Sequence, residues 1–162
     1  MTIPYPVRCL ASGAVGATVL TVIHEKARRA HPDAPRMDLV GMRALRQVLR
    51  ALGQRVPPRA QVHRLALAGD LIANSIYYAA VPASTTTATW VRGALLGAVA
   101  GVGALTLPSQ IGLGDPPKSD RPTNQAMTVA WYVVGALAAA AAATAMRPRR
   151  RPAGFRTDMI RA

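Results

Sequence analysis

The stretch from residue 126 to residue 146, AMTVAWYVVGALAAAAAATAM, contains no charged side chain. At a helical rise of about 1.5 Å per residue it extends over about 31 Å, which matches the hydrocarbon core of a bilayer. Its alanine tract is only mildly hydrophobic, so we expect neighbouring helices to help hold it in the membrane. The stretch therefore predicts a membrane-spanning helix.

Three further apolar runs have the length of membrane-spanning helices, and we expect helices at residues 7–29, 63–81 and 89–107. The first run is not a signal peptide, because the basic sequence HEKARR follows it in place of an Ala-x-Ala cleavage site. Together with residues 126–146, these runs predict an all-α fold. We expect a single membrane domain over residues 1–162, an integral membrane four-helix bundle.

Charged residues are segregated from these apolar runs. Lys and Arg total 20 against 7 Asp and Glu, a net charge of +13, and they gather between residues 24 and 64 and after residue 146. A soluble surface mixes both signs, so this distribution is typical of charges that flank a membrane. Aromatic residues make up only 4% of the chain and do not alternate with the basic clusters, which disfavours base stacking. We expect anionic lipid headgroups as partners, and no nucleic acid.

A short amphipathic helix is expected at residues 37–52, between the first two apolar runs. Its polar face carries three arginines at helical spacing, Arg43, Arg46 and Arg50. The helix is too short and too charged to cross the bilayer, so we expect it to lie in the interface with these arginines toward lipid phosphates. The positive-inside rule then places the basic segment 24–64, including the interfacial segment 30–62, in the cytoplasm.

The number of spans has two interpretations. Four spans place the basic tail, residues 147–162, opposite to the segment 24–64, which the positive-inside rule disfavours. In the alternative, residues 63–81 enter the membrane without crossing it, which leaves three spans. Hydropathy favours four, as does an aromatic belt expected at the outer surface. The belt would consist of Tyr77, Tyr78 and Trp90.

One face of the helix expected at residues 63–81 carries four polar side chains at helical spacing: His63, Asp70, Asn74 and Tyr77. A carboxylate inside a membrane helix costs about 2.5–3.5 kcal/mol, so Asp70 should face protein and have a partner. Asn74 is one candidate partner, and Lys26 or Arg29 of the first helix is another. The pattern favours a structural clamp between helices, and a proton or substrate site is the functional alternative.

Three glycines recur every four residues in the helix expected at residues 89–107: Gly93, Gly97 and Gly101. A repeated G-x-x-x-G lets a neighbouring helix approach closely, because no side chain separates the two backbones. We therefore expect tight packing of this face, either within the chain or onto a partner subunit.

Several residues of metal-ligating type lie near the expected cytoplasmic surface: His24, Glu25, His31, Asp33 and Asp38. Their spacing matches no known motif, because Arg28 stands where an H-E-x-x-H sequence needs its second histidine. The single cysteine, Cys9, cannot form an intramolecular disulfide. The sequence therefore predicts no metal site, no cofactor and no catalytic residue.

Short runs along the chain resemble a group of small, uncharacterised bacterial inner-membrane proteins. The runs are His24–Glu25, Ala34–Asp38, Gly41–Ala44, Gly69–Leu71, Asn74–Ser75, Tyr77–Tyr78, Leu107–Pro108 and Gly112–Gly114. The resemblance implies a compact multi-helix protein in a bacterial cytoplasmic membrane and implies no activity.

Three functions compete on these observations. Glycine-faced helices and little soluble mass favour a non-enzymatic accessory or scaffold subunit of a larger membrane assembly, of respiratory or photosynthetic type, or a self-associating protein. A small transporter or channel would use Asp70 and Asn74. A membrane enzyme at the cytoplasmic headgroup level would use His24, Glu25 or Asp38.

Overall fold

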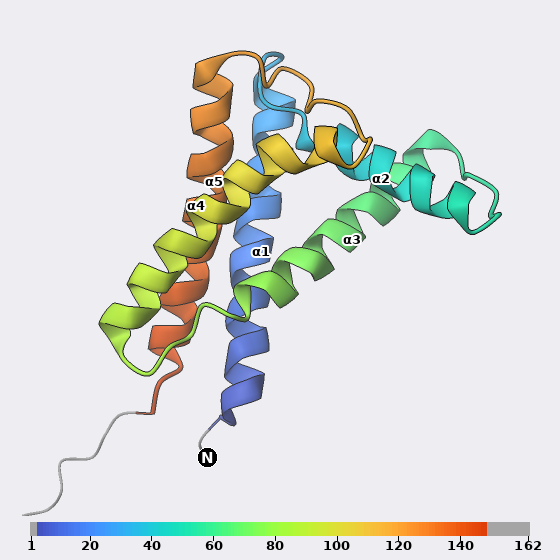
Figure 1. Ribbon diagram of the computed structural model, residues 1–162. Coiled ribbons are helices and arrows are strands. Elements are labelled where there is room, and N and C mark those ends of the chain that lie inside the picture. Colours follow the sequence, from blue (N-terminus) through green and yellow to red (C-terminus); the bar gives the residue numbers. More distant parts are fainter. Residues whose placement is uncertain (1–2, 149–162) are drawn as a thin grey trace, which may run out of the picture.

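The computed structural model describes residues 3–148, and within them it has five α-helices and no β-strand (Figure 1). The all-α prediction is confirmed. The helices are α1 (Tyr5–Ala30), α2 (Met37–Ala51), α3 (Arg59–Tyr78), α4 (Thr86–Gln110) and α5 (Pro122–Ala145). The predicted basic tail begins at residue 147, and all of it beyond residue 148 lies outside the described residues.

Two helix boundaries differ by a few residues from those expected from the sequence, and a proline lies at each of them. α3 begins at Arg59, four residues before the predicted start, because Pro58 caps the helix and its carbonyl accepts from the Val62 amide at 3.0 Å. α4 continues past its predicted end at residue 107, with Pro108 inside its last turn. Proline removes one backbone donor, but the Ile111 amide still donates to the Leu107 carbonyl at 3.1 Å, so the turn persists.

Three of the helices, α1, α4 and α5, are long and apolar enough to cross a membrane. This is the composition of a membrane protein. α3 is not among the three, because its first half carries Arg59, His63 and Arg64, and Asp70 follows near its centre.

α5 lies at the centre of the molecule and packs against α1 on one side and α4 on the other (Figure 1). α3 packs against α1, and α2 packs against α3, so α2 and α3 form a hairpin that projects to one side. In Figure 1 this hairpin extends to the right of α1, while α4 begins on the opposite side and runs diagonally across to end near α2. The helices therefore splay apart more than in a compact bundle.

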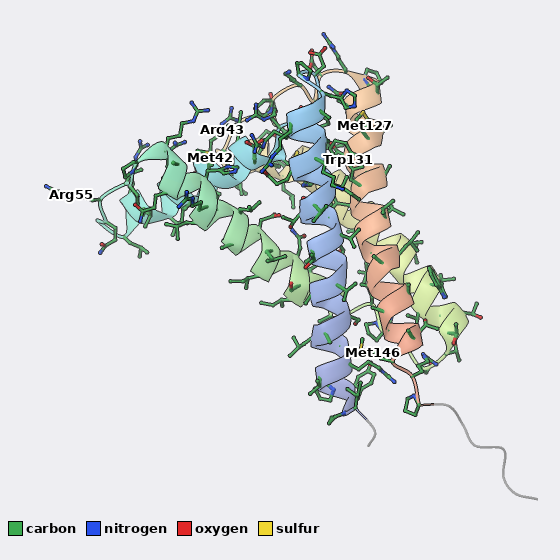
Figure 2. The ribbon with its side chains drawn as sticks, turned by 180° about the vertical axis from the view of Figure 1, so that it is seen from behind. Met42, Arg43, Arg55, Met127, Trp131 and Met146 are labelled. Atoms are coloured by element: carbon green, nitrogen blue, oxygen red, sulfur yellow. The ribbon has the colours of Figure 1, made fainter. Side chains whose placement is uncertain are left out.

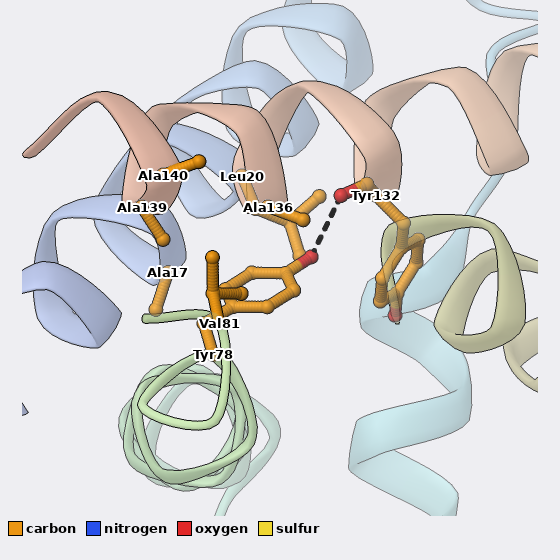
Figure 3. Close-up of a cluster of buried hydrophobic side chains, with 8 residues drawn as sticks. All are labelled: Ala17, Leu20, Tyr78, Val81, Tyr132, Ala136, Ala139 and Ala140. Carbon is orange, nitrogen blue, oxygen red and sulfur yellow. Dashed lines mark hydrogen bonds between the residues drawn. The ribbon is translucent and has the colours of Figure 1, made fainter. Parts of the chain in front are cut away.

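The core lies where α1, the end of α3 and α5 meet, and small side chains allow the close approach. A Cβ added at Gly16 would lie 2.6 Å from the Gly135 carbonyl oxygen. Tyr78 is fully buried there, and its hydroxyl donates to the Tyr132 carbonyl at 2.9 Å (Figure 3). The prediction of an aromatic belt is therefore wrong for Tyr78, because its hydroxyl finds a buried acceptor on α5. The cluster drawn in Figure 3 is Ala17, Leu20, Tyr78, Val81, Tyr132, Ala136, Ala139 and Ala140.

The glycine face of α4 lies against α5. A Cβ at Gly97 would come within 2.6 Å of the Val133 Cα, and a Cβ at Gly101 within 2.6 Å of the Val129 Cα. At Gly93 the nearest atom would be the Ala136 carbonyl oxygen, at 3.2 Å. These three positions are therefore occupied by contacts within the chain.

Candidate functional site

A partly enclosed cavity of about 190 Å³ lies where α1, α2 and α3 converge with the C-terminal part of α4. α1 contributes Thr21, His24, Glu25 and Arg28. α3 contributes His63, Ala66, Leu67 and Asp70, and α2 closes the cavity with Met37, Asp38, Val40 and Gly41. Tyr132 of α5 lines it as well. We call this cavity the junction pocket.

Helical periodicity explains why these side chains meet. The α1 residues occupy positions i, i+3, i+4 and i+7, counted from Thr21, and therefore share one face of the helix. The α3 residues have the same spacing, counted from His63. Because α1 and α3 pack against each other, the two faces enclose a shared space. The helical spacing of both sets can be read in the sequence, but only the set on α3 was predicted to share one face.

Two carboxylates of the junction pocket are paired with arginines. Glu25 accepts from Arg28 through both oxygens, at 3.1 Å from Nε and 2.7 Å from Nη2. Asp38 accepts from Arg36 at 2.8 Å through each oxygen. Burial alone would raise the pKa of Asp38, but the hydrogen bonds and charge of Arg36 outweigh it and hold that pKa below its usual value. Both acids are therefore neutralised by their neighbours.

Asp70 differs, because no basic side chain of residues 3–148 forms an ion pair with its carboxylate, and the side chain within its reach is the neutral amide of Asn74. The predicted partner Asn74 donates from Nδ2 to the main-chain carbonyl of Asp70, at 3.0 Å. The predicted counter-charges also lie elsewhere, since Arg29 contacts Glu25 at 3.4 Å and Lys26 is exposed. Asp70 thus presents a carboxylate without a counter-charge to the junction pocket.

Two further polar groups of the junction pocket lack partners. Thr21 Oγ1 and His24 Nε2 are buried and have no hydrogen-bond partner among the described residues. The His24 ring is held edge-on by Trp131, at 5.3 Å between ring centroids, and by Tyr132, at 5.7 Å. Figure 2 labels Trp131 on α5, beside the end of α1 that carries His24. Buried polar atoms normally have partners, so these two atoms are positions where water or a ligand can bind.

The predicted polar stripe of α3 divides into two parts. His63 and Asp70 line the junction pocket, and His63 Nε2 lies 3.7 Å from the Glu25 carboxylate. Asn74 bonds within its own helix, and the Tyr77 hydroxyl donates to the Leu96 carbonyl of α4 at 3.0 Å. Of the four side chains, Tyr77 therefore links two helices, Asn74 bonds within α3, and His63 and Asp70 face the pocket.

The three arginines of α2 have different surroundings. Arg43 donates to the carbonyls of Leu113 and Asp115, at 3.1 and 3.0 Å, and so binds α2 to the loop after α4. Arg46 is partly exposed and Arg50 is exposed. Val48 of the same helix is 53% exposed, and Leu52, directly after the helix, is 68% exposed. Figure 2 shows Arg43 at the inner end of the hairpin and Arg55 at its outer tip.

Within residues 3–148, no group of three or more His, Cys, Asp and Glu side chains is arranged to hold a metal ion. His24, Glu25, Asp38 and His63 share the junction pocket nonetheless, which the sequence analysis did not foresee.

No protein-family model, curated protein or solved structure matches this chain.

Proposed function

We propose that the protein is a small four-span transporter of a bacterial cytoplasmic membrane, and that it binds a cation at Asp70. The cation is a proton or a small organic ammonium ion with an apolar part. The segment 24–64 would be cytoplasmic, so the junction pocket would open toward the cytoplasm. The unpaired carboxylate of Asp70 in the pocket is the observation that carries the proposal.

The course of α3 supports the fourth span. Its last turn packs on α1 near Gly13, whose added Cβ would lie 2.7 Å from the Ala79 amide nitrogen. Just beyond it, the Tyr5 hydroxyl donates to the Pro82 carbonyl at 3.2 Å. α3 therefore connects the end of α1 that carries His24 with the end that carries Tyr5. The exposed side chains on its outer face, such as Ile72 and Ile76, suit contact with lipid.

The charges of the junction pocket support a cationic ligand. Glu25 and Asp38 are paired with arginines, so Asp70 supplies the uncompensated charge. In apolar surroundings such a charge attracts a proton or a cation strongly, because water does not screen it. Thr21 Oγ1 and His24 Nε2 offer hydrogen bonds to the same ligand. Apolar side chains on α2 and α3 would contact its hydrocarbon part.

A membrane enzyme at the headgroup level is the second candidate, because His24, Glu25 and Asp38 converge in the same pocket. The accessory-subunit hypothesis stays a prediction. Its main support was the glycine face of α4, and that face packs on α5 within the chain. A partner subunit would have to bind another surface.

Replacement of Asp70 by Asn tests the proposal. We use benzyltrimethylammonium as a small apolar cation and measure its binding to purified protein by calorimetry. Proton uptake into proteoliposomes, driven by an inside-negative potassium diffusion potential, gives a second measurement. D70N should reduce cation binding at least about tenfold and abolish proton uptake, since one ion pair in apolar surroundings is worth 1.4 kcal/mol or more. The fold should persist, because Asn keeps the shape.

Asp120→Asn is the matched control, because Asp120 is an exposed acid in the loop before α5. This variant should behave like the wild type in both measurements. The proposal is wrong if the wild type neither binds the cation nor takes up protons. It is also wrong if D70N and the wild type are equal.

A further inference from the structure

The end of the molecule remote from the junction pocket contains a second cleft, of about 520 Å³. The start of α1, the turn between α3 and α4 and the end of α5 meet there (Figure 1). Tyr5, Arg8, Ser84 and Arg147 are among the residues that line the cleft. Figure 2 labels Met146 at this end of α5. Arg8 and His24 are 16 residues apart on α1, or about 24 Å, so the two sites are separate.

Three guanidinium groups surround this turn. Arg92 donates to the Pro82 carbonyl at 3.3 Å. Arg147 donates to the carbonyls of Ala83 and Ser84, the latter at 3.0 Å, and to Thr89 Oγ1 at 3.2 Å. The guanidinium carbon of Arg8 lies 5.0 Å from the centre of the Tyr5 ring. These partners are neutral groups, so they leave the three positive charges uncompensated.

Arg8 has the least satisfied side chain of the three. Its Nε is buried and has no hydrogen-bond partner among the described residues. A buried donor without a partner is costly, and a guanidinium donor more so, because the charge is desolvated as well. The stacking on Tyr5 recovers only part of that cost.

Among the described residues, the elements that form this end supply no carboxylate to complete the site. Residues 1–24, 71–114 and 121–157 contain no Asp or Glu, and these ranges cover the start of α1, the whole of α4 and all of α5. An external anion is therefore the group that can neutralise the three arginines.

We propose that this cleft binds the phosphate group of an anionic phospholipid, with Arg8 and Arg147 as its main ligands. Guanidinium groups match phosphate oxygens in geometry and in charge, and they form short, charge-assisted hydrogen bonds with them. The helices that carry Arg8 and Arg92 also carry exposed apolar side chains. Leu10 of α1 is 57% exposed and Val91 of α4 is 54% exposed, which suits contact of these helices with lipid acyl chains.

Arg8→Gln is the test variant, because Arg8 Nε makes no hydrogen bond that its removal would break. Arg55→Gln is the matched control, since Arg55 is an exposed arginine at the tip of the hairpin (Figure 2). We reconstitute each variant in nanodiscs that contain phosphatidylglycerol and phosphatidylcholine, and count the lipids retained by native mass spectrometry. We also measure thermal unfolding in detergent with added phosphatidylglycerol, phosphatidylcholine or inorganic phosphate.

The wild type and R55Q should retain phosphatidylglycerol in preference to phosphatidylcholine, and R8Q should bind phosphatidylglycerol about tenfold more weakly. Arg8→Lys should show an intermediate loss, because an ammonium group keeps the charge without the planar fork. If R8Q fails to fold, the affinity of the Arg8→Lys variant for phosphatidylglycerol tests the proposal in its place. Equal retention of both lipids by the wild type, or equal affinity in R8Q and R55Q, overturns the proposal. Protection by inorganic phosphate without phosphatidylglycerol selectivity overturns the lipid assignment, and the site is then one for free phosphate.

Discussion

Asp38 and Asp70 both line the junction pocket, but their neighbours give them different roles. Arg36 forms two hydrogen bonds with Asp38, and the pKa of Asp38 is low as a result. Asp70 has no basic neighbour, so its carboxyl group stays available for a ligand. The difference depends on where each arginine points, and not on the residue type of the acid.

The Asp38–Arg36 pair predicts a specific dependence of stability on pH. A depressed pKa in the folded state means that the pair stabilises the protein above about pH 4, and that this contribution is lost as pH falls through the folded pKa. Arg36→Gln should therefore lower the free energy of unfolding by about 1–3 kcal/mol at neutral pH. The difference from the wild type should shrink as pH falls below about 4 and through the lowered pKa of Asp38, because only at the acid end of that range is Asp38 protonated in both proteins.

Thermal unfolding in detergent between about pH 3 and pH 7 measures this effect. Arg50→Gln is the control, because Arg50 is exposed on the same helix. A pH-independent difference between R36Q and the wild type would contradict the assignment.

The sequence identified Asp70 as a site residue but could not identify its surroundings. Its position inside an apolar run was enough to predict that it faces protein. Asp70 has no basic partner because, on α1, Arg29 contacts Glu25 and Lys26 is exposed to solvent. Rotamer choices of this kind follow from packing across helices. For the same reason, the contribution of His24 and Thr21 to the pocket emerged only from the structure.

At the scale of helices, the contact between α4 and α5 is sensitive to substitution. A side chain at Gly97 would meet the Val133 backbone and force the two helices apart. Gly97→Leu should therefore destabilise the protein by about 1–3 kcal/mol or more. Thermal unfolding and the yield of folded protein in detergent measure the effect.

Gly69→Ala is the matched control, because no atom lies within 4 Å of an added Cβ at that position of α3. It should be neutral or stabilise the protein by about 0.5–1 kcal/mol, since alanine is the better helix former. Equal stability of G97L and the wild type would contradict the packing described for α4.

Periodicity and hydropathy were sufficient to predict every helix, because both are local properties of the chain. The helix ends were less predictable, since Pro58 and Pro108 sit at positions where the helix tolerates them. The tilt of α3 could not be predicted at all. It follows from the close contact at Gly13 near one end and from the packing on α2 at the other.

At the scale of the whole molecule, the proposed four crossings would place the two turns that flank α3 on opposite sides of the membrane. We replace Cys9 by Ala and introduce single cysteines by Arg55→Cys and Ser84→Cys, both at exposed positions. A membrane-impermeant maleimide should label S84C in intact cells, and R55C only after permeabilisation. Labelling of both positions from the same side would establish the three-span alternative.

The central position of α5 has a consequence for the order of assembly during synthesis. Of the five described helices, α5 is the last to leave the ribosome, yet it supplies the partner surface for both α1 and α4. The contact between Gly16 and Gly135 joins residues more than a hundred positions apart in the chain. Until α5 has been synthesised, the close-packing faces at Gly16 and Gly97 lack their α5 partner and can pack against non-native helices. A nascent chain halted before residue 122 would therefore expose both faces at once, which makes the last helix the step that commits the protein to its fold.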